Sequence, residues 1–169
     1  MNVNEFVKNV SIIRKNVVII GSPASGKTYL ADQLKNKYKY HKYISTDDYK
    51  EHGFKEALYK VIKDIENTKS RWVVEGVLGY RLIRKGVEQA NPDIIPDLII
   101  ILNTSEENIK KVYDIRGKSD KLEKVMSMIK SNDKVFQDYL KKASDVHTMI
   151  YRIENEFKPK KPRRSRISR

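Results

Sequence analysis

Short, largely apolar runs recur along this chain and are separated by longer stretches with helical spacing. The four clearest runs lie at residues 16–20, 43–45, 71–74 and 97–102. A run without polar alternation is typical of a strand that is buried on both faces, as in a parallel sheet. Strands that alternate with helices predict an α/β fold of three layers, in which helices cover both faces of a parallel sheet of at least four strands.

The intervening stretches predict helices. Residues 2–15 place apolar side chains three or four positions apart, as in a short amphipathic helix. Thr104 with Glu107 matches a capping box, in which two side chains satisfy the free amides at a helix start, and Asp120 with Glu123 repeats the pattern. We therefore expect helices to begin at both places.

A short basic loop separates those two expected helices. It consists of Arg116-Gly117-Lys118-Ser119, and helical spacing resumes at Leu122 and continues to Leu140. We expect the loop and its flanking helices to form a small lid. No strand is evident after Lys142.

The first apolar run ends at a loop that contains two glycines. The loop is Gly21-Ser22-Pro23-Ala24-Ser25-Gly26-Lys27-Thr28, and a helix continues from Tyr29. The glycines let the backbone wrap around phosphate oxygens, while successive amides and the positive end of the helix attract their charge. Lys27 would reach the β- and γ-phosphates, and Thr28 would bind Mg²⁺. We therefore assign residues 21–29 to ATP and Mg²⁺, on a P-loop NTPase fold with strand order 2-3-1-4.

Two adjacent acids follow the second run. Asp47 and Asp48 stand where the tip of a neighbouring strand would face the phosphate loop. Transfer of a phosphoryl group to a hydroxyl needs a group that takes or orients the hydroxyl's proton. Because adjacent side chains point in different directions, we assign this catalytic role to Asp47. The alternative is that one of the two acids caps the following helix.

Residues 1–50 resemble the bacteriophage-type polynucleotide 5′-kinases. The resemblance rests on the phosphate loop and on an aromatic-rich strand that is followed by Asp47-Asp48-Tyr49-Lys50. It implies that Asp47 is the general base and that Lys27 and Thr28 contact the nucleotide. Lys50 stands where that family has an arginine that contacts the acceptor's phosphate. A lysine cannot form the bidentate contact of a guanidinium.

A third acid lies at the end of the third run, in Trp72-Val73-Val74-Glu75-Gly76-Val77. At that position Glu75 could hold a metal-bound water or the acceptor, although an acid that ends a strand can also face solvent. The pattern is similar to nucleoside and nucleotide kinases, and to phage kinases that phosphorylate hydroxymethylated pyrimidines within DNA. We therefore count Glu75 among the candidate metal and substrate ligands.

Basic side chains near these elements are candidates for binding phosphate. Arg81 follows Glu75 and could clamp an acceptor phosphate beside it. Arg116, with Lys118, could close over the γ-phosphate and stabilise its charge in the transition state. The alternative for each is ordinary solvated surface.

Charge then narrows the choice of acceptor. The 169-residue chain has a formal net charge of +13, and residues 158–169 contain seven basic residues and no acidic ones. A cationic surface attracts polyanions by releasing their counterions. We therefore expect a kinase domain at 1–157 and a basic tail at 158–169 that contacts DNA or RNA. The expected acceptor is a hydroxyl on nucleic acid, at a 5′ end or on a hydroxymethylated base.

Two other functions stay open. The acceptor can be a free nucleoside or nucleotide, or the protein can be a nucleic-acid-binding P-loop ATPase without an acceptor. Composition excludes several further classes, because a chain without cysteine has no disulfide, thiolate metal site or cysteine nucleophile. No apolar run approaches the roughly 20 residues of a membrane span, and we expect a cytoplasmic protein without a membrane partner.

Overall fold

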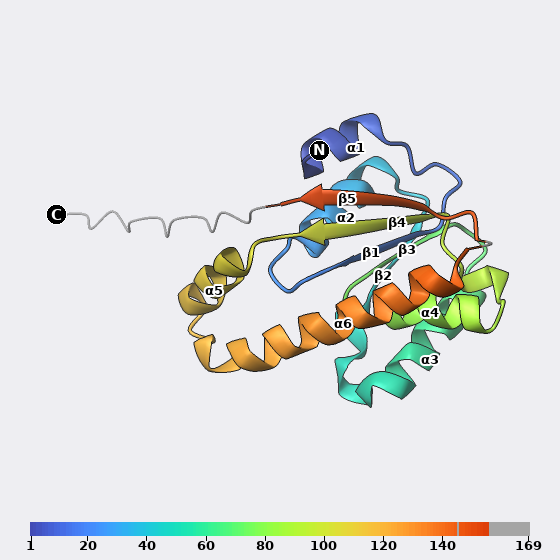
Figure 1. Cartoon of the computed structure of the whole chain (residues 1–169). Helices are drawn as coiled ribbons and strands as arrows, with labels where there is room; N and C mark the ends of the chain where they lie inside the picture. Colours follow the sequence, from blue (N-terminus) through green and yellow to red (C-terminus); the bar gives the residue numbers. More distant parts are fainter. Residues whose placement is uncertain (145, 156–169) are drawn as a thin grey trace.

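The computed structural model describes residues 1–144 and 146–155. Its centre is a five-stranded sheet in which every pairing is parallel, with the order β2-β3-β1-β4-β5 (Figure 1). The strands are β1 (Val17–Gly21), β2 (Lys42–Ser45), β3 (Trp72–Glu75), β4 (Leu98–Asn103) and β5 (Met149–Glu154). The α/β fold and the order 2-3-1-4 are confirmed, and one further strand extends the sheet.

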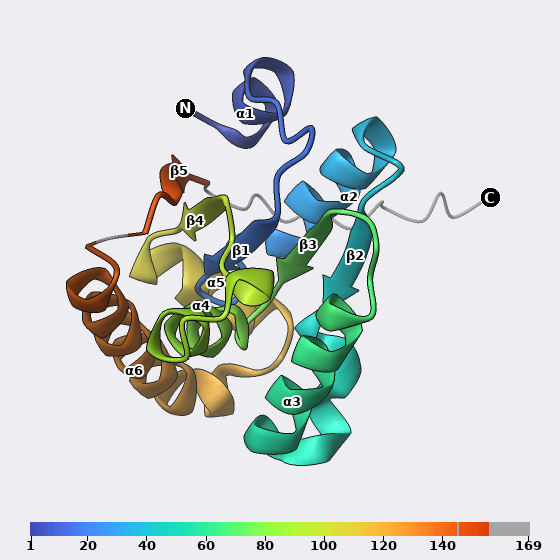
Figure 2. The same ribbon diagram turned by 90° about the vertical axis from the view of Figure 1, so that its right-hand side faces the viewer.

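Helices cover both faces of the sheet, as the alternating pattern predicted. The α1 and α2 helices lie over one face, and α3, α4 and α6 lie over the other (Figure 2). The α-helices are α1 (Val3–Asn9), α2 (Lys27–Lys37), α3 (Gly53–Glu66), α4 (Gly79–Glu88), α5 (Glu106–Ile115) and α6 (Leu122–Lys142), and the 3₁₀ turns are η1 (Thr46–His52), η2 (Pro92–Ile94) and η3 (Ser119–Lys121).

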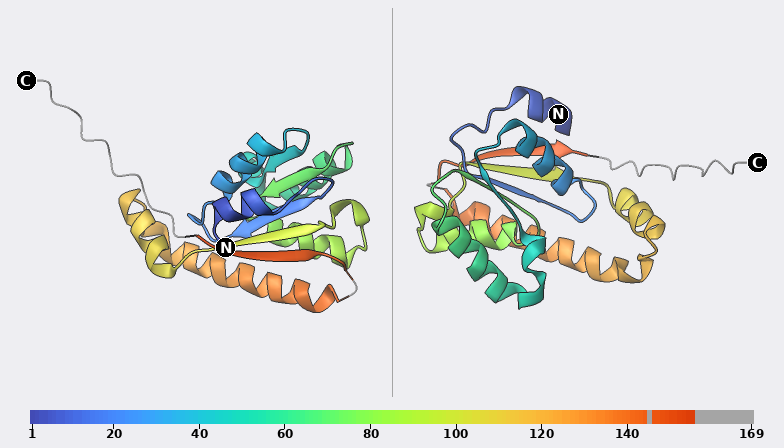
Figure 3. Two further views of the ribbon diagram at one scale, coloured as in Figure 1. Left: turned by 90° about the horizontal axis from the view of Figure 1, so that it is seen from above. Right: turned by 180° about the vertical axis from the view of Figure 1, so that it is seen from behind.

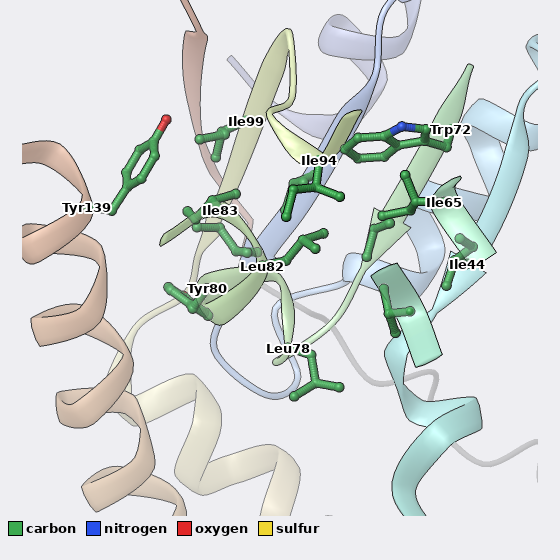
Figure 4. Close-up of a cluster of buried hydrophobic side chains, with 14 of the residues drawn as sticks. Ile44, Ile65, Trp72, Leu78, Tyr80, Leu82, Ile83, Ile94, Ile99 and Tyr139 are labelled. Atoms are coloured by element: carbon green, nitrogen blue, oxygen red, sulfur yellow. The ribbon is translucent and has the colours of Figure 1, made fainter. Parts of the chain in front are cut away.

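Buried apolar side chains form two clusters, one on each face of the sheet. Along β1, Val18 and Ile20 belong to the cluster beneath α3, α4 and α6, whereas Val17 and Ile19 belong to the cluster beneath α1 and α2. Figure 4 shows part of the first cluster, which includes Trp72 at the start of β3. Burial on both faces explains why β1 is an uninterrupted apolar run.

The β5 strand was not expected from the sequence. It occupies one edge of the sheet and pairs with β4 in a register that places Met149 beside Leu98. Ile153 is its only fully buried residue, whereas Arg152 and Glu154 are exposed. An edge strand that is mostly exposed has no continuous apolar run, so its sequence gives little sign of a strand.

The predictions of a capping box at the start of α5 and of α6 are both wrong. The α5 helix is capped by Ser105, whose hydroxyl accepts a hydrogen bond from the Asn108 amide at 3.1 Å. Thr104 lies one residue earlier and accepts a hydrogen bond from the Asn108 side chain at 2.7 Å. The α6 helix begins after Lys121 with no side-chain cap. The residue types matched the motif, but a cap acts only where the backbone leaves helical geometry.

The first helix is shorter than the predicted range of 2–15. It ends at Asn9, and its start is a capping box in which Asn2 and Glu5 bond each other's amides at 2.9 Å. Val10 lies beyond the helix and packs against the cluster beneath α1 and α2, whereas Ile13 is 63% exposed. The apolar spacing therefore came partly from a packed loop.

No helix in the described part of the chain combines the length and the apolarity needed to cross a bilayer. The predicted basic tail at 158–169 and the boundary after residue 157 lie outside the described residues. The described residues share one sheet and its two covering layers.

Candidate active site

All five strands have their C-terminal ends on the same side of the sheet, because every pairing is parallel. The register places Ser45 beside Glu75 and Gly21 beside Leu102. The α5 helix and the start of α6 lie beyond these C-terminal strand ends (Figures 1 and 3). Strand ends, phosphate loop and the α5–α6 turn line a cleft of about 500 Å³.

Most residues that were selected from the sequence meet in this cleft. They are Pro23, Ala24, Gly26, Lys27, Thr28 and Tyr29 of the loop, together with Asp47, Lys50, Glu75, Arg116 and Lys118. Val77, Tyr113 and Met128 also line the cleft and were not predicted from the sequence. Tyr113 and Met128 lie on helices and Val77 in a turn, and an apolar or aromatic residue in either place carries no sequence signal that it faces a site.

The phosphate loop is held in a backbone conformation that few residues favour. Ala24 has a φ of 62° and Gly26 a φ of 91°. A Cβ atom on Gly26 would lie 2.5 Å from the side-chain nitrogen of Asn155, and that nitrogen donates a hydrogen bond to the Ser25 carbonyl at 2.9 Å. Glycine at position 26 is therefore required by its φ and by the close approach of Asn155. The residue that follows β5 thus helps to hold the loop.

The Lys27 side chain folds back into the loop. Its Nζ donates hydrogen bonds to the carbonyl oxygens of Gly21 at 3.0 Å and Ser22 at 2.8 Å. Burial lowers the pKa of Lys27 to about 8, although the negative charges of Glu75 and Asp47 act in the opposite direction. Lys27 is therefore still a cation at neutral pH, and it has already lost much of its hydration.

The loop has unused hydrogen-bonding groups that fit a phosphate chain. The hydroxyls of Ser22 and Ser25 are buried and have no hydrogen-bond partner among the described residues. Buried hydroxyls normally have a partner, because a buried polar group that lacks a hydrogen bond costs about 1–3 kcal/mol of stability. Thr28 is exposed in the first turn of α2, where a phosphate-bound Mg²⁺ would lie. These residues fit ATP with Mg²⁺.

Asp47 lies in η1, directly after β2. Its side chain is 58% exposed and pairs with Lys50 at 3.4 Å. Asp48 is also exposed but does not line the cleft. Neither acid caps α3, because the residue before that helix is His52 and it makes no side-chain cap. The structure therefore places Asp47 in the cleft and removes the capping alternative for α3.

Glu75 is the most buried carboxylate of the cleft, with only 7% of its surface exposed. Burial raises the pKa of Glu75, while the Ser45 hydroxyl, which donates to it at 2.5 Å, and the charge of Lys27 oppose the rise. Among the described residues, no cluster of three acids, histidines or cysteines could hold a metal. A metal ion here would therefore rely on Thr28, Glu75 and the nucleotide's own oxygens.

The α5–α6 turn brings two cations to the cleft, at Arg116 and Lys118. Arg116 is the C-cap residue that follows α5, and Gly117 comes next with a φ of 64°. Arg81 does not join them. Its guanidinium lies over the Phe54 ring at 5.3 Å and lines a neighbouring groove. The predicted clamp on Glu75 is therefore not assembled within the cleft.

No family model matches this chain, and no curated protein matches it by sequence. Solved structures do resemble it. The YorR protein of Bacillus subtilis, solved with phosphorylated GDP, is 16% identical with a TM-score of 0.51, and the match covers 82% of this chain and 84% of that one. The deoxyadenosine kinase of M. mycoides, solved with the products dCMP and dCDP, is 13% identical with a TM-score of 0.49 over 85% and 92% of the two chains. The fold of this chain is that of the P-loop NTPases.

Proposed function

We propose that this protein is a kinase that transfers the γ-phosphate of Mg-ATP to a hydroxyl of a nucleoside, nucleotide or nucleic acid. The observation that carries the proposal is a single cleft lined by the phosphate loop and by Asp47, Glu75 and Arg116. A protein that only bound a nucleotide would need the loop alone. A phosphotransferase also needs a group for the acceptor's proton, close to the transferred phosphate.

On the donor side, residues 21–29 bind ATP. The loop amides and the unpartnered hydroxyls of Ser22 and Ser25 contact phosphate oxygens, and Lys27 exchanges its two carbonyl partners for oxygens of the β- and γ-phosphates. Mg²⁺, held by Thr28 and Glu75, would offset the negative charge of the phosphates. Arg116 contributes a further positive charge from the α5–α6 turn.

On the acceptor side, Asp47 is the proposed general base. It takes the proton of the acceptor hydroxyl as that oxygen bonds to the γ-phosphorus and the bond to the bridging oxygen breaks, which releases ADP. Lys50, its ion-pair partner, is placed to contact the acceptor. Glu75 is less suited to this role, because the Ser45 hydroxyl already donates to one of its oxygens and its own proposed role is to hold Mg²⁺.

Two acceptor classes fit these observations. The net charge of +13 favours a polyanion, and therefore a hydroxyl on nucleic acid at a 5′ end or on a hydroxymethylated base. The cleft of about 500 Å³ is also of the size that binds a small molecule, and so a free nucleoside or nucleotide is the second candidate.

Transfer of labelled γ-phosphate tests the proposal. The acceptors are 5′-hydroxyl DNA and RNA, DNA with 5-hydroxymethyluracil, nucleosides and nucleoside monophosphates. We expect Asp47→Asn to lower kcat by about 10²–10⁴-fold, as for loss of a general base. The Kd for ATP should stay within about twofold of the wild-type value. Glu75→Gln should instead weaken the Mg²⁺ dependence.

Asp48→Asn is the matched control, because this acid is adjacent, exposed and outside the cleft. Full activity in Asp47→Asn would refute the assignment of the base. Release of phosphate with no labelled acceptor would mean an ATPase, and failure to bind ATP would refute the donor site.

A further inference from the structure

A second groove opens beside the cleft. It has a volume of about 530 Å³ and lies between α4, the α5–α6 turn and the first half of α6. Val77, Tyr113, Lys118 and Met128 line both cavities. A molecule whose accepting oxygen faces the phosphate loop could therefore extend into this groove without leaving the protein surface.

The two cavities differ in charge. The cleft is lined by Asp47 and Glu75 as well as by cations. The groove is lined by the cations Arg81, Lys118, Lys121 and Lys124, and no acidic residue is among its described walls. We name it the cationic groove. Its charge is available to an anion, whereas much of the cleft's positive charge faces the two carboxylates.

The cations of this groove are also unpaired. Across the described residues, none of Arg81, Lys118, Lys121 and Lys124 forms an ion pair with a carboxylate. Elsewhere on the surface, lysines commonly pair with an acid one helical turn away, as Lys110 does with Glu106 at 3.1 Å and Lys60 with Glu56 at 3.6 Å. Like charges that converge on one groove repel one another, and a bound anion relieves that repulsion.

An aromatic ring completes the groove. Phe54 is 56% exposed at the start of α3, and the Arg81 guanidinium lies over its ring at 5.3 Å. Val125 and Met128 add apolar surface from α6. A flat apolar wall beside a row of cations suits a nucleobase joined to phosphate, because the base can stack while the phosphate contacts the cations.

We propose that the cationic groove binds a phosphate of the acceptor, so that the preferred acceptor is a nucleotide with a phosphate separate from the hydroxyl that accepts. This inference rests on the proposed function. The phosphate that binds in the groove has two sources, a single nucleotide or a nucleic-acid chain. A free nucleoside lacks the group that the groove binds and is therefore the poorer acceptor.

The test compares acceptors that differ by one phosphate. Nucleosides and their 3′-monophosphates both offer the same 5′-hydroxyl, and short 5′-hydroxyl oligonucleotides supply the chain. We expect kcat/KM to be at least about tenfold higher for the 3′-monophosphates, as for contacts to a charged group. In Lys121→Gln/Lys124→Gln that preference should fall toward one, while the KM for ATP stays within about twofold, because neither lysine lines the cleft.

Lys134→Gln is the matched control, since this exposed lysine lies on the same helix but outside the groove. A larger loss with oligonucleotides than with mononucleotides would identify a nucleic-acid chain as the source, and an equal loss a single nucleotide. Equal kcat/KM for nucleosides and 3′-monophosphates, or a preference that survives the double substitution, would overturn the inference.

Direct binding separates this inference from the proposed function. Calorimetry with a 3′-monophosphate and its nucleoside, in wild type and in the double variant, needs no turnover. Tighter binding of the 3′-monophosphate that is lost in the double variant would support the groove even if no acceptor were labelled. Transfer to acceptors with no difference in this binding would retain the kinase and remove the groove's role.

Discussion

The phosphate loop and the cationic groove lie side by side but are built differently. The loop is shaped by backbone carbonyls, positive φ angles and a lysine folded inward. The groove is lined by long side chains from α4, the α5–α6 turn and α6, of which Lys121 and Lys124 are exposed. A backbone cradle suits a partner of constant shape, such as a triphosphate, whereas flexible exposed cations suit acceptors that vary. Substitutions should therefore affect the two regions differently.

Within the phosphate loop and the groove, the largest effect is expected at Lys27. We expect Lys27→Met to lower kcat/KM for ATP by about 10²–10³-fold, as for loss of one charged donor to a transition state. The effect should be the same for every acceptor, because the loop does not contact the acceptor. Steady-state kinetics with two acceptors measures it, and Lys35→Met, an exposed position on the same helix, is the control. An effect confined to one acceptor would contradict the division between the regions.

The next largest effect tests the backbone itself. Gly26→Ala forces an L-residue to a φ of 91° and collides with Asn155, so we expect the KM for ATP to rise about tenfold or more. Gly53→Ala is the matched control, because Gly53 has a φ of 67° but no atom within 4 Å of the added carbon. Thermal unfolding should show a loss of stability in both variants. A nucleotide defect of equal size in Gly53→Ala would show that general strain is the cause.

The pH dependence of ATP use gives an intermediate effect. A lowered pKa means that Lys27 is charged below about pH 8 and neutral above it. Because kcat/KM reports the free enzyme, we expect kcat/KM for ATP to fall about tenfold for each pH unit above that value. Far-UV circular dichroism at pH 9 checks that the fold persists. A profile that stays flat to pH 10 would refute the proposed role of the Lys27 charge.

The smallest effect is expected at Asn155. Loss of its hydrogen bond to the Ser25 carbonyl should raise the KM for ATP about two- to tenfold in Asn155→Ala, without a change in the KM for the acceptor. Glu154→Gln, on the preceding residue, is the control. An equal rise in both variants would locate the effect in β5 as a whole.

The sequence predicted the features of this molecule that depend on residues close together in the chain. Strand β1 and the phosphate loop were recognisable because burial on both faces and a fixed run of eight residues leave little freedom. Asp47 and Glu75 could be placed beside the loop because parallel strands end at the same edge.

Other features depend on packing that a single sequence does not specify. The contact of Asn155 with Ser25 joins residues 130 positions apart and required a strand that the pattern did not reveal. Arg81 was expected beside Glu75, but the direction in which α4 presents it, toward Phe54, is set by how α3 and α4 pack. The groove's charge likewise arises from α4, the α5–α6 turn and α6, which meet only in the fold.

The position of β5 at the sheet edge also bears on aggregation. In the described part of the chain it pairs with one strand only, and Met149 and Ile150 are 47% and 38% exposed. Charge next to such an edge discourages pairing between molecules, and the seven basic residues of 158–169 follow this strand in sequence. Deleting these residues would therefore remove the proposed attraction to polyanions and, at the same time, a charge that opposes self-association.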